Sequence, residues 1–368
     1  MVDEEAGHTL DRRSALRGAA AGAAAAGAAW VAPAILSVDA ARAATAPPVP
    51  PVANVVGSSY LAFPTNGTRW VDSGNLVTPT MTQNLTPATG DPAYTGNDIA
   101  GASGTAAIAA TGSTVVTSTN TGSSWTRESV SAGIAPIQTH FGVAVSPAQT
   151  IVAVGSTTII AAFGGRDGFR HPFGGSWSSV TLSGGAIAFR TWYDVAWGNS
   201  LFVAVGDGGR VTFSSDDGAT WSGYVVQSGV LWRSIAYDAV TGLWWMSGTL
   251  SSYAFSADPT AGAASWTYGQ TGASANTIDY DGVDADGGTI LLVGQNGTVS
   301  RTTNAGGSWT GTGPAGLTNW NGVATDDNGN WTICGDLGSV AVSGDDGLTW
   351  TAAATPSGVP QLNSAVYL

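Results

Sequence analysis

The stretch Leu201–Gly223, LFVAVGDGGRVTFSSDDGATWSG, contains the pattern that decides the fold of this chain. Two short alternating runs, Phe202–Val205 and Arg210–Phe213, are joined by an Asp-Gly-Gly turn. A second turn, Ser-Ser-Asp-Asp-Gly, then leads to Trp221. Short alternating runs separated by glycine-containing turns are typical of antiparallel strands. We therefore expect a three-stranded meander with a tight turn at each bend.

The second of these turns has a clear physical logic. Asp216 and Ser214 can accept hydrogen bonds from the backbone N–H groups of their own turn. Gly218 supplies the positive φ that the bend needs, and Trp221 can fold its ring over the turn and bury it. The sequence therefore predicts a turn that is stabilised by its own side chains.

The same unit recurs along the chain. Close copies occupy Ala107–Thr126, Leu291–Thr310 and Ile333–Thr351, and looser ones occupy Val55–Trp70, Val152–Trp177 and Trp245–Trp266. The copies end on the marker tryptophans Trp70, Trp125, Trp177, Trp221, Trp266, Trp309 and Trp350. Successive markers are 41 to 55 residues apart, which is the length of a four-stranded propeller blade. Seven markers predict an all-β, seven-bladed β-propeller.

The first blade lacks its innermost strand at the N-terminal end. Val52–Val56 and Tyr60–Phe63 read as its second and third strands, and Arg69–Asp72 as its outer strand. The missing inner pattern is found at the other end of the chain, in Asn363–Tyr367, which matches inner strands such as Asp194–Trp197. We expect this last strand to pair into the first blade, because closing the ring removes exposed strand edges.

Residues 1–43 read as a targeting segment. Asp11–Arg17 resembles a twin-arginine export signal, an apolar stretch rich in Ala and Gly follows, and Ala41–Ala43 fits a cleavage site. An uncleaved membrane anchor is the alternative, disfavoured because the stretch is weakly apolar and contains Pro33. We expect a signal peptide at 1–43, a Pro-rich linker at 44–51 and the propeller at 52–368. The mature protein would then be secreted, outside the cytoplasm of a bacterium.

The charge of the chain excludes some partners. There is no lysine, and from Ala44 onward eight arginines face nineteen aspartates and one glutamate, a net charge of −12. An acidic protein of this kind is a poor ligand for nucleic acid and for anionic membranes. Cys334, the single cysteine, lies in an apolar run and reads as a buried core thiol. We expect a monomer with no membrane insertion after signal cleavage.

The turn motif resembles a known one. Its form S-x-D-x-G-x-T-W is the Asp-box of BNR repeats, and the two boxes around Trp221 and Trp350 match it fully. The residues assigned to these structural turns are Ser214, Asp216, Gly218, Trp221, Asn304, Trp309, Ser343, Asp345, Gly347 and Trp350. The whole repeat resembles the photosystem II stability/assembly-factor-like propellers and, more distantly, sialidase-type propellers. That resemblance implies a fold rather than a function, and it implies that the boxes lie away from the ligand face.

Catalysis of the sialidase type finds little support in the residues. Members of that class use an arginine triad, a tyrosine with a glutamate partner, and an acidic aspartate. The nearest arginine motif here, Phe169–Pro172, lies in blade three, inside a swollen turn spanning Arg166–Phe173. Glu128 reads as the ion-pair partner of Arg127. We therefore expect no catalytic residue; if the protein were an enzyme, a glycoside hydrolase using paired aspartates would be the class.

A metal site is a weaker possibility. Asp279, Asp281, Asp284 and Asp286 lie within eight residues, in what we expect to be the turn from the inner to the second strand of blade six. Carboxylates at this density suit calcium, whereas a solvated acidic turn is the plainer interpretation. No other cofactor is expected.

The candidate binding face is the end opposite the Asp-boxes, where loops lead into the inner strands. The residues assigned to it are His140, Arg190, Trp192, Tyr193, Trp232, Arg233, Asn276, Trp320 and Asn321. Aromatic rings with amide and guanidinium donors suit a glycan or an extended polypeptide. The plainer interpretation is that the tryptophans pack between blades. We expect a non-catalytic binding or assembly module for an extracytoplasmic polypeptide or glycan; the alternatives are a sialidase-like hydrolase and a structural cell-surface protein.

Overall fold

The computed structural model consists almost entirely of β-strands. It describes residues 53–58, 70–72, 81–83, 96–110, 114–120, 126–129, 138–157, 168–182, 191–316, 318–353 and 361–367. The predicted signal peptide and linker, with Arg190, lie outside these residues. Within the described part of the chain, no helix is both long and apolar enough to cross a membrane.

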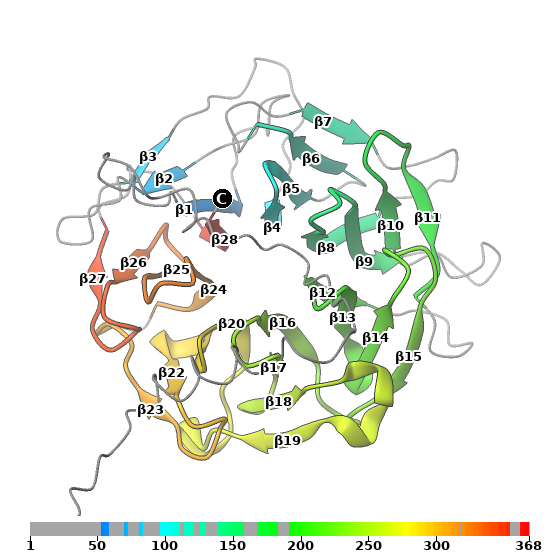
Figure 1. The fold of residues 1–368 in the computed structure, drawn as a ribbon. Helices are drawn as coiled ribbons and strands as arrows, with labels where there is room; N and C mark the ends of the chain where they lie inside the picture. Colours follow the sequence, from blue (N-terminus) through cyan, green and yellow to red (C-terminus); the bar gives the residue numbers. More distant parts are fainter. Residues whose placement is uncertain are drawn as a thin grey trace, which may run out of the picture. The chain divides into compact units, whose positions relative to one another are not determined.

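Six blades are each built from four strands that follow one another in the sequence (Figure 1). The first two contain β4 (Gly96–Ala102), β5 (Thr105–Ala110), β6 (Thr114–Ser118) and β7 (Thr126–Ser129), then β8 (Gln138–Val145), β9 (Ile151–Thr157), β10 (Gly168–His171) and β11 (Ser178–Val180). The next two contain β12 (Trp192–Gly198), β13 (Leu201–Gly206), β14 (Arg210–Ser214) and β15 (Ser222–Val225), then β16 (Trp232–Asp238), β17 (Leu243–Gly248), β18 (Ser252–Ser256) and β19 (Thr267–Gln270). The last two contain β20 (Tyr280–Asp286), β21 (Thr289–Gly294), β22 (Val299–Thr302) and β23 (Thr310–Gly311), then β24 (Trp320–Thr325), β25 (Trp331–Gly335), β26 (Val340–Ser343) and β27 (Thr351–Ala352). Short 3₁₀ turns occupy η4 (Asp207–Gly209), η5 (Pro259–Ala261), η6 (Ala263–Ser265), η7 (Ala273–Ala275) and η8 (Gln295–Gly297).

A further four-stranded sheet joins the two ends of the propeller region. Its order is β28-β1-β2-β3, with β1 at Ala53–Ser58, β2 at Trp70–Asp72, β3 at Met81–Gln83 and β28 at Gln361–Tyr367. In the antiparallel pairing of β28 with β1, Val55 lies opposite Ala365. The simple plan of four consecutive strands thus holds for six blades rather than for the seven that the repeats predicted. The structure describes no side chains in β1, β2 and β3.

Two details of the predicted repeat were wrong. The segment around Trp70 is the third strand of its sheet rather than the outer one, and the outer strand is β3. In the blade of β8 to β11, the segment predicted as a swollen turn, Arg166–Phe173, contains strand β10. The prediction was wrong because this part of the chain matches the repeat poorly, and no turn signal fixed its alignment.

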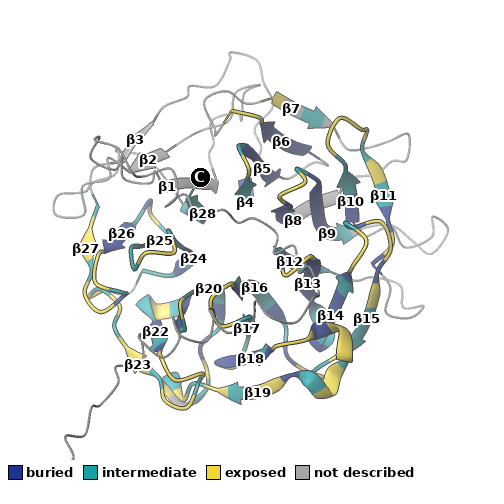
Figure 2. Ribbon diagram, viewed as in Figure 1, coloured by how far each residue is buried: buried dark blue, intermediate teal, exposed yellow. Residues whose placement is uncertain are grey.

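The second strand of each of these six blades carries the core. β13 is buried along its whole length, and so are the second strands β5, β21 and β25 of other blades (buried residues are dark blue in Figure 2). Because side chains alternate along a strand, Phe202 and Ala204 pack with Val152 of the preceding blade. Val203 packs with residues of the following blade. Each second strand is thus covered on both faces by neighbouring blades. Its sequence is therefore a continuous hydrophobic run, whereas a strand with one exposed face would alternate apolar and polar residues.

The inner strands contact one another in a cycle: β4 contacts β8, and the contacts continue through β12, β16, β20, β24 and β28 back to β4. We call the end of the blades where these inner strands begin the mouth end. Because successive strands are antiparallel, the turns from third to outer strands lie at the opposite end, which we call the turn end. The two ends carry different chemistry.

Candidate functional site at the mouth end

A β-bulge at the start of each inner strand aims one side chain at the axis. In β12, Trp192 is opposite Gly206 and Asp194 is opposite Val205, so Tyr193 is an extra residue without a partner in the ladder. The same shift recurs in the other inner strands. The extra residues are Asn97, Phe141, Tyr193, Arg233, Asp281, Asn321 and Asn363. Bulges re-aim side chains in this way at functional sites.

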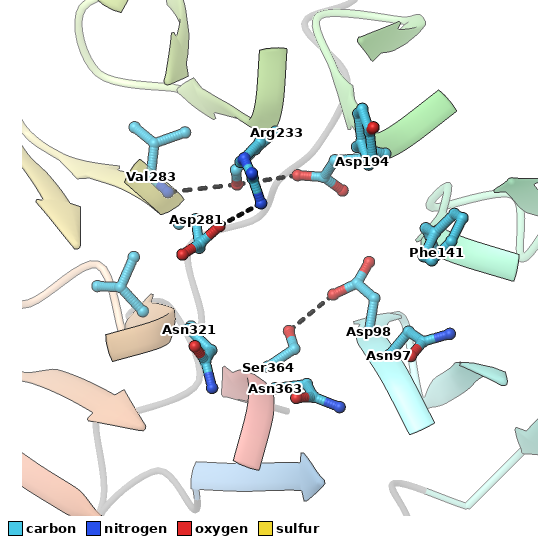
Figure 3. Close-up of a pocket in the computed structure, with 15 residues that line it drawn as sticks. Asn97, Asp98, Phe141, Asp194, Arg233, Asp281, Val283, Asn321, Asn363 and Ser364 are labelled. Carbon is cyan, nitrogen blue, oxygen red and sulfur yellow. Dashed lines mark hydrogen bonds and ion pairs between the residues drawn. The ribbon is translucent and has the colours of Figure 1, made fainter. Parts of the chain in front are cut away.

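These side chains surround a cavity that we call the axial mouth. Its lining residues are Asn97, Asp98, Phe141, Tyr193, Asp194, Arg233, Ser234, Asp281, Gly282, Val283, Asn321, Gly322, Val323, Asn363 and Ser364. Figure 3 shows the labelled side chains converging on it from separate strands. The cavity volume is about 90 Å³, well below the roughly 300–1,000 Å³ of pockets that enclose a whole small-molecule ligand. The axial mouth therefore suits one side-chain tip or a small group rather than a whole peptide segment.

Two aspartates at the base of the axial mouth link neighbouring blades. Asp98 accepts hydrogen bonds from Val143 N at 2.9 Å and from Ser364 Oγ at 2.7 Å. Asp194 accepts from Ser234 Oγ at 2.9 Å and from Ile235 N at 2.8 Å. Each carboxylate thus joins its own inner strand to an adjacent one, and these links hold the rim of the mouth in place.

Burial changes the titration of both carboxyl groups. It raises the pKa of Asp98 to about 6, against the opposing hydrogen bonds from Ser364, Val143 and Ile99. Burial first, and the charge of Asp98 second, raise the pKa of Asp194 well above its usual range. Desolvation disfavours the charged form, and two nearby carboxylates resist double ionisation. Burial therefore favours the protonated, neutral form of these carboxyl groups more than water would.

Arg233 is the single cation among the described residues that line the axial mouth. Its guanidinium donates to Asp281 Oδ1 at 2.9 Å and to Asp279 Oδ2 at 3.3 Å, and 32% of its side chain is exposed. Burial raises the pKa of Asp281, while Arg233 opposes that rise. The arginine is thus already neutralised by carboxylates of the next blade, and the mouth as a whole keeps an acidic balance.

The prediction that three tryptophans form aromatic platforms on this face was wrong. Trp192, Trp232 and Trp320 are 1%, 0% and 5% exposed, and each belongs to an apolar layer shared by two blades. They immediately precede the bulged residues, so the bulge turns the following side chain inward to the axis while the tryptophan remains between blades. Aromatic surface at the mouth comes instead from Phe141 and Tyr193, whose ring centroids are 5.9 Å apart.

The other residues assigned to this face divide into two groups. Tyr193, Arg233 and Asn321 line the axial mouth. Asn276 does not: it follows η7 with a φ of 65° and accepts a hydrogen bond from Gly272 N. The predicted alignment of blade six was wrong by five residues, and Asp281 holds the position expected for Asn276. His140 lies in β8, with its side chain outside the described residues.

The prediction that Asp279, Asp281, Asp284 and Asp286 lie together in a turn was also wrong. The segment is strand β20 rather than a turn, so its carboxylates are distributed over different contacts. Asp279 and Asp281 bind Arg233, whereas Asp284 and Asp286 accept backbone N–H groups from Thr325 and Gly329. Within the described ranges, no group of three or more potential metal ligands lies together.

At the turn end, the S-x-D-x-G-x-T-W segments form the expected hydrogen bonds. Asp216 accepts from Ser214 Oγ at 2.8 Å and from Thr220 N at 2.8 Å. Gly218 has a φ of 83°, and Trp221 is 6% exposed with its Nε1 donating to Gly218 O at 3.0 Å. Ser343, Asp345, Gly347 and Thr349 repeat the pattern, and Trp350 is half-buried beside it.

The turn that has Asn304 in place of the aspartate keeps the same geometry, although its side-chain amide now donates one of the hydrogen bonds. Asn304 Oδ1 accepts from Ser308 N at 3.0 Å, as an aspartate would, while Nδ2 donates to Ser308 Oγ at 3.0 Å. Trp309, which follows this turn, is half-buried and packs with Trp245 and Tyr253 of the neighbouring blade. The variant residue therefore preserves the turn.

Arginines at the turn end link one blade to the next. Arg170 donates to Asp217 O at 2.6 Å and to its carboxylate at 3.1 Å. Arg301 makes the equivalent pair of bonds to Asp346 at 2.7 and 2.6 Å. The F-R-H-P segment thus contributes a structural arginine on strand β10. Glu128 accepts hydrogen bonds from Thr117 and Trp177; the side chain of Arg127, its predicted ion-pair partner, lies outside the described residues.

Asp98 and Asp194 are the residues that sequence reasoning missed. Both directly follow a bulged residue, and Ser234 and Ser364 hold the equivalent position in other inner strands. The aligned inner strands contained this signal, a short polar residue one position after Asn97, Tyr193, Arg233 and Asn363. Its meaning depended on knowing that the strands converge at the axis.

Comparison with known proteins defines the class of the fold. No family model and no curated protein matches the sequence. Among solved structures, YCF48 bound to D1 peptide is similar over 70% of this chain and 80% of that one, with a TM-score of 0.52 and 15% sequence identity. YCF48 from Cyanidioschyzon merolae has a TM-score of 0.51 at 15% identity, covering 71% of this chain and 88% of that chain. The WD40 repeats of RRP9 reach 0.55 at 8% identity, covering 73% and 83%. The fold is therefore a β-propeller, as predicted, and identities this low show the fold alone.

Proposed function

We propose that this protein is an exported, non-catalytic β-propeller that binds an extracytoplasmic polypeptide at its mouth end. The observation that carries this proposal is the ring of bulged side chains. It brings aromatic, amide and charged groups from separate strands into one polar cavity. Convergent polar groups in a concave site are typical of ligand recognition. A structure of similar fold, described as YCF48 bound to D1 peptide, supports a peptide as the ligand class.

A binding role accounts for the carboxylates better than a hydrolytic one. Asp98 and Asp194 each accept three hydrogen bonds, including two from backbone N–H groups. A catalytic carboxylate must instead contact substrate or water. The protein should therefore release no chromophore from nitrophenyl glycosides. Turnover that is lost in a folded Asp194→Asn variant would establish a hydrolase instead.

We further propose that the sheet of β28 with β1–β3 acts as the seventh blade and closes the ring, and that S-x-D-x-G-x-T-W turns are Asp-boxes in the structural sense. Export rests on the twin-arginine pattern in residues 1–43. Its test is replacement of Arg12 and Arg13 by lysine, which should retain the protein in the cytoplasm of a bacterium with twin-arginine export.

The binding proposal is tested on peptide and glycan arrays. The full chain is compared with Tyr193→Ser, which removes a half-buried ring from the axial mouth, and with Asp346→Asn, which changes the turn end. Retention on peptide spots should be lost in Tyr193→Ser and kept in Asp346→Asn. Retention on glycan spots alone would show that the ligand is a sugar rather than a polypeptide. Retention that is unchanged in Tyr193→Ser would contradict a binding site at the mouth end.

A further inference from the structure

The axial mouth has an acidic balance that its arginine does not offset. Asp98, Asp194 and Asp281 line it together with one cation, Arg233, which is already held by Asp281 and Asp279. The mature chain carries an excess of negative charge as well. A partner that places a positive charge here gains from both the local and the long-range field. Among the described residues no group of three or more potential metal ligands lies together, whereas an organic cation needs only the carboxylates and ring faces that the mouth presents.

Ring faces next to the carboxylates suit the same type of ligand. Phe141 and Tyr193 line the cavity as a tilted pair, and the electron-rich face of such a ring attracts a Lys or Arg side chain. The volume of the cavity, about 90 Å³, admits the end of one such side chain. The backbone of the partner must then lie outside, across the mouth end.

A second cavity, which we call the groove, lies at the mouth end. It has a volume of about 280 Å³ and is lined mainly by small or apolar residues between the blades of β20–β23 and β24–β27, including Pro314, Trp320, Leu337 and Ala353. Trp320 lines this groove, and the next residue, Asn321, lines the axial mouth. Both cavities are therefore lined in part by the first two residues of β24.

Leu337 at the rim of the groove is held in a conformation that suits it poorly. It has a φ of 56° and is 82% exposed. Leucine is disfavoured in the left-handed region, where its Cβ lies too close to the following carbonyl oxygen, whereas glycine and asparagine visit that region more readily. The equivalent turn of the preceding blade has Asn296, with a φ of 57°. Strain at a surface apolar residue that an asparagine would relieve is consistent with a role in binding rather than in folding.

We propose that the axial mouth takes a lysine or arginine side chain of the partner polypeptide, while an aliphatic side chain of the same partner lies in the groove against Leu337. This inference rests on the proposed function, since it specifies which peptides the mouth end binds. Two anchors on one extended segment give register as well as charge selectivity.

The test begins with a phage-displayed library of random dodecapeptides, panned against the immobilised full chain. The selected sequences should share a lysine or arginine and a nearby aliphatic residue. A synthetic peptide is then compared with its lysine→norleucine analogue, which keeps the aliphatic stem and removes the charge, by fluorescence anisotropy. We expect the analogue to bind about tenfold more weakly, the loss typical of an anchor residue in an interface.

Protein variants separate the specific site from general attraction to an acidic surface. Asp281→Asn should weaken the parent peptide severalfold, whereas Asp346→Asn, an equal change of charge at the turn end, should leave its affinity unchanged. Leu337→Asn should weaken binding while leaving the urea midpoint of unfolding unchanged or higher, because the strained backbone is relieved. A loss of binding through misfolding would lower that midpoint.

The possible failures are distinguishable. Equal affinity for the norleucine analogue, with binding still lost in Tyr193→Ser, would overturn the cation inference and leave polypeptide binding at the mouth intact. Equal weakening by Asp281→Asn and Asp346→Asn would reduce the effect to net charge and also overturn it. Failure to enrich any peptide above an unrelated acidic protein would contradict the proposed function itself.

Discussion

Asp216 at the turn end and Asp194 at the mouth end accept the same number of hydrogen bonds through their carboxylates. Asp216 accepts three, from Ser214 and from the hydroxyl and N–H of Thr220. Asp194 accepts three from Val195, Ser234 and Ile235. Partial desolvation of Asp216 is outweighed by its hydrogen bonds, which lower its pKa to about 2. Burial and the charge of Asp98 raise the pKa of Asp194 instead.

The comparison shows that hydrogen bonding alone does not decide what a carboxylate does. At the turn end the aspartate is exposed, so its hydrogen bonds stabilise the charged form at little cost in solvation. At the mouth end the same bonds only partly compensate for the loss of water. The same residue type thus stabilises a turn as a charged group at one end of the propeller, whereas burial favours its protonated form beside a cavity at the other.

The largest expected effect comes from removing the end of β28. Deletion of residues 363–368 takes Asn363 and Ser364 from the axial mouth and the pairing partner from β1, while leaving every turn at the turn end in place. We expect loss of cooperative unfolding, measured by circular dichroism during a urea titration. A truncated chain that unfolds cooperatively at the parent midpoint would show that β28 does not close the ring.

Within the mouth end, substitutions of a buried tryptophan and of a bulged residue should differ sharply in how much they lower the free energy of unfolding. Trp232→Ala removes a side chain that is 0% exposed and should lower the free energy of unfolding by about 3–5 kcal/mol. Tyr193→Ser, at a bulged position, should cost less because its ring is only half-buried. Urea midpoints measure both. Similar losses would mean that the bulged residues also belong to the core.

The pH dependence of stability tests the two kinds of aspartate together. For Asp98 the pKa is about 6 in the folded state against an ordinary 3.8. The folded state therefore binds more protons between these values, and its stability should increase as pH falls from 7 to 5, by about 1 kcal/mol for such a carboxylate. Asp284, with its pKa raised to about 7 by burial, acts in the same direction.

The contribution of the turn-end aspartates to stability has the opposite dependence on pH. With a lowered pKa, Asp216 and Asp345 contribute stability above pH 4 that is lost only as pH falls towards 2. The urea midpoint should therefore pass through a maximum between these windows. A midpoint that falls steadily from pH 7 downward would contradict raised pKa values at the axial mouth.

The smallest effect is expected in the turn itself. Asp216→Ala removes the acceptor for the turn and should cost about 1 kcal/mol, as for a lost helix cap or side-chain hydrogen bond. Asp216→Asn should cost only a few tenths of that, because Asn304 shows how an amide fills the same place. Thermal unfolding of the two variants side by side provides the measurement. Equal losses would show that the charge, rather than the acceptor geometry, stabilises the turn.

The sequence by itself determined the repeat, the strands and the turn chemistry. Gly218, Ser214 and Asp216 act on backbone within four residues of themselves, so their pattern carries its own structural meaning. The same local logic predicted the buried Cys334, which lies in a second strand and is 0% exposed. Where the repeat was degenerate, as around Trp70 and Asp281, the assignment of strands was wrong because no turn signal fixed the register.

The candidate site was decided only by the tertiary structure. Trp232 and Arg233 are adjacent in the sequence, yet the bulge between them sends one side chain into the layer between blades and the other towards the axis. Asp98 and Asp194 are 96 positions apart in the numbering and influence each other only because the inner strands converge. Turn chemistry is local and can be read from neighbouring residues, whereas burial and charge at the axis depend on strands from every part of the ring.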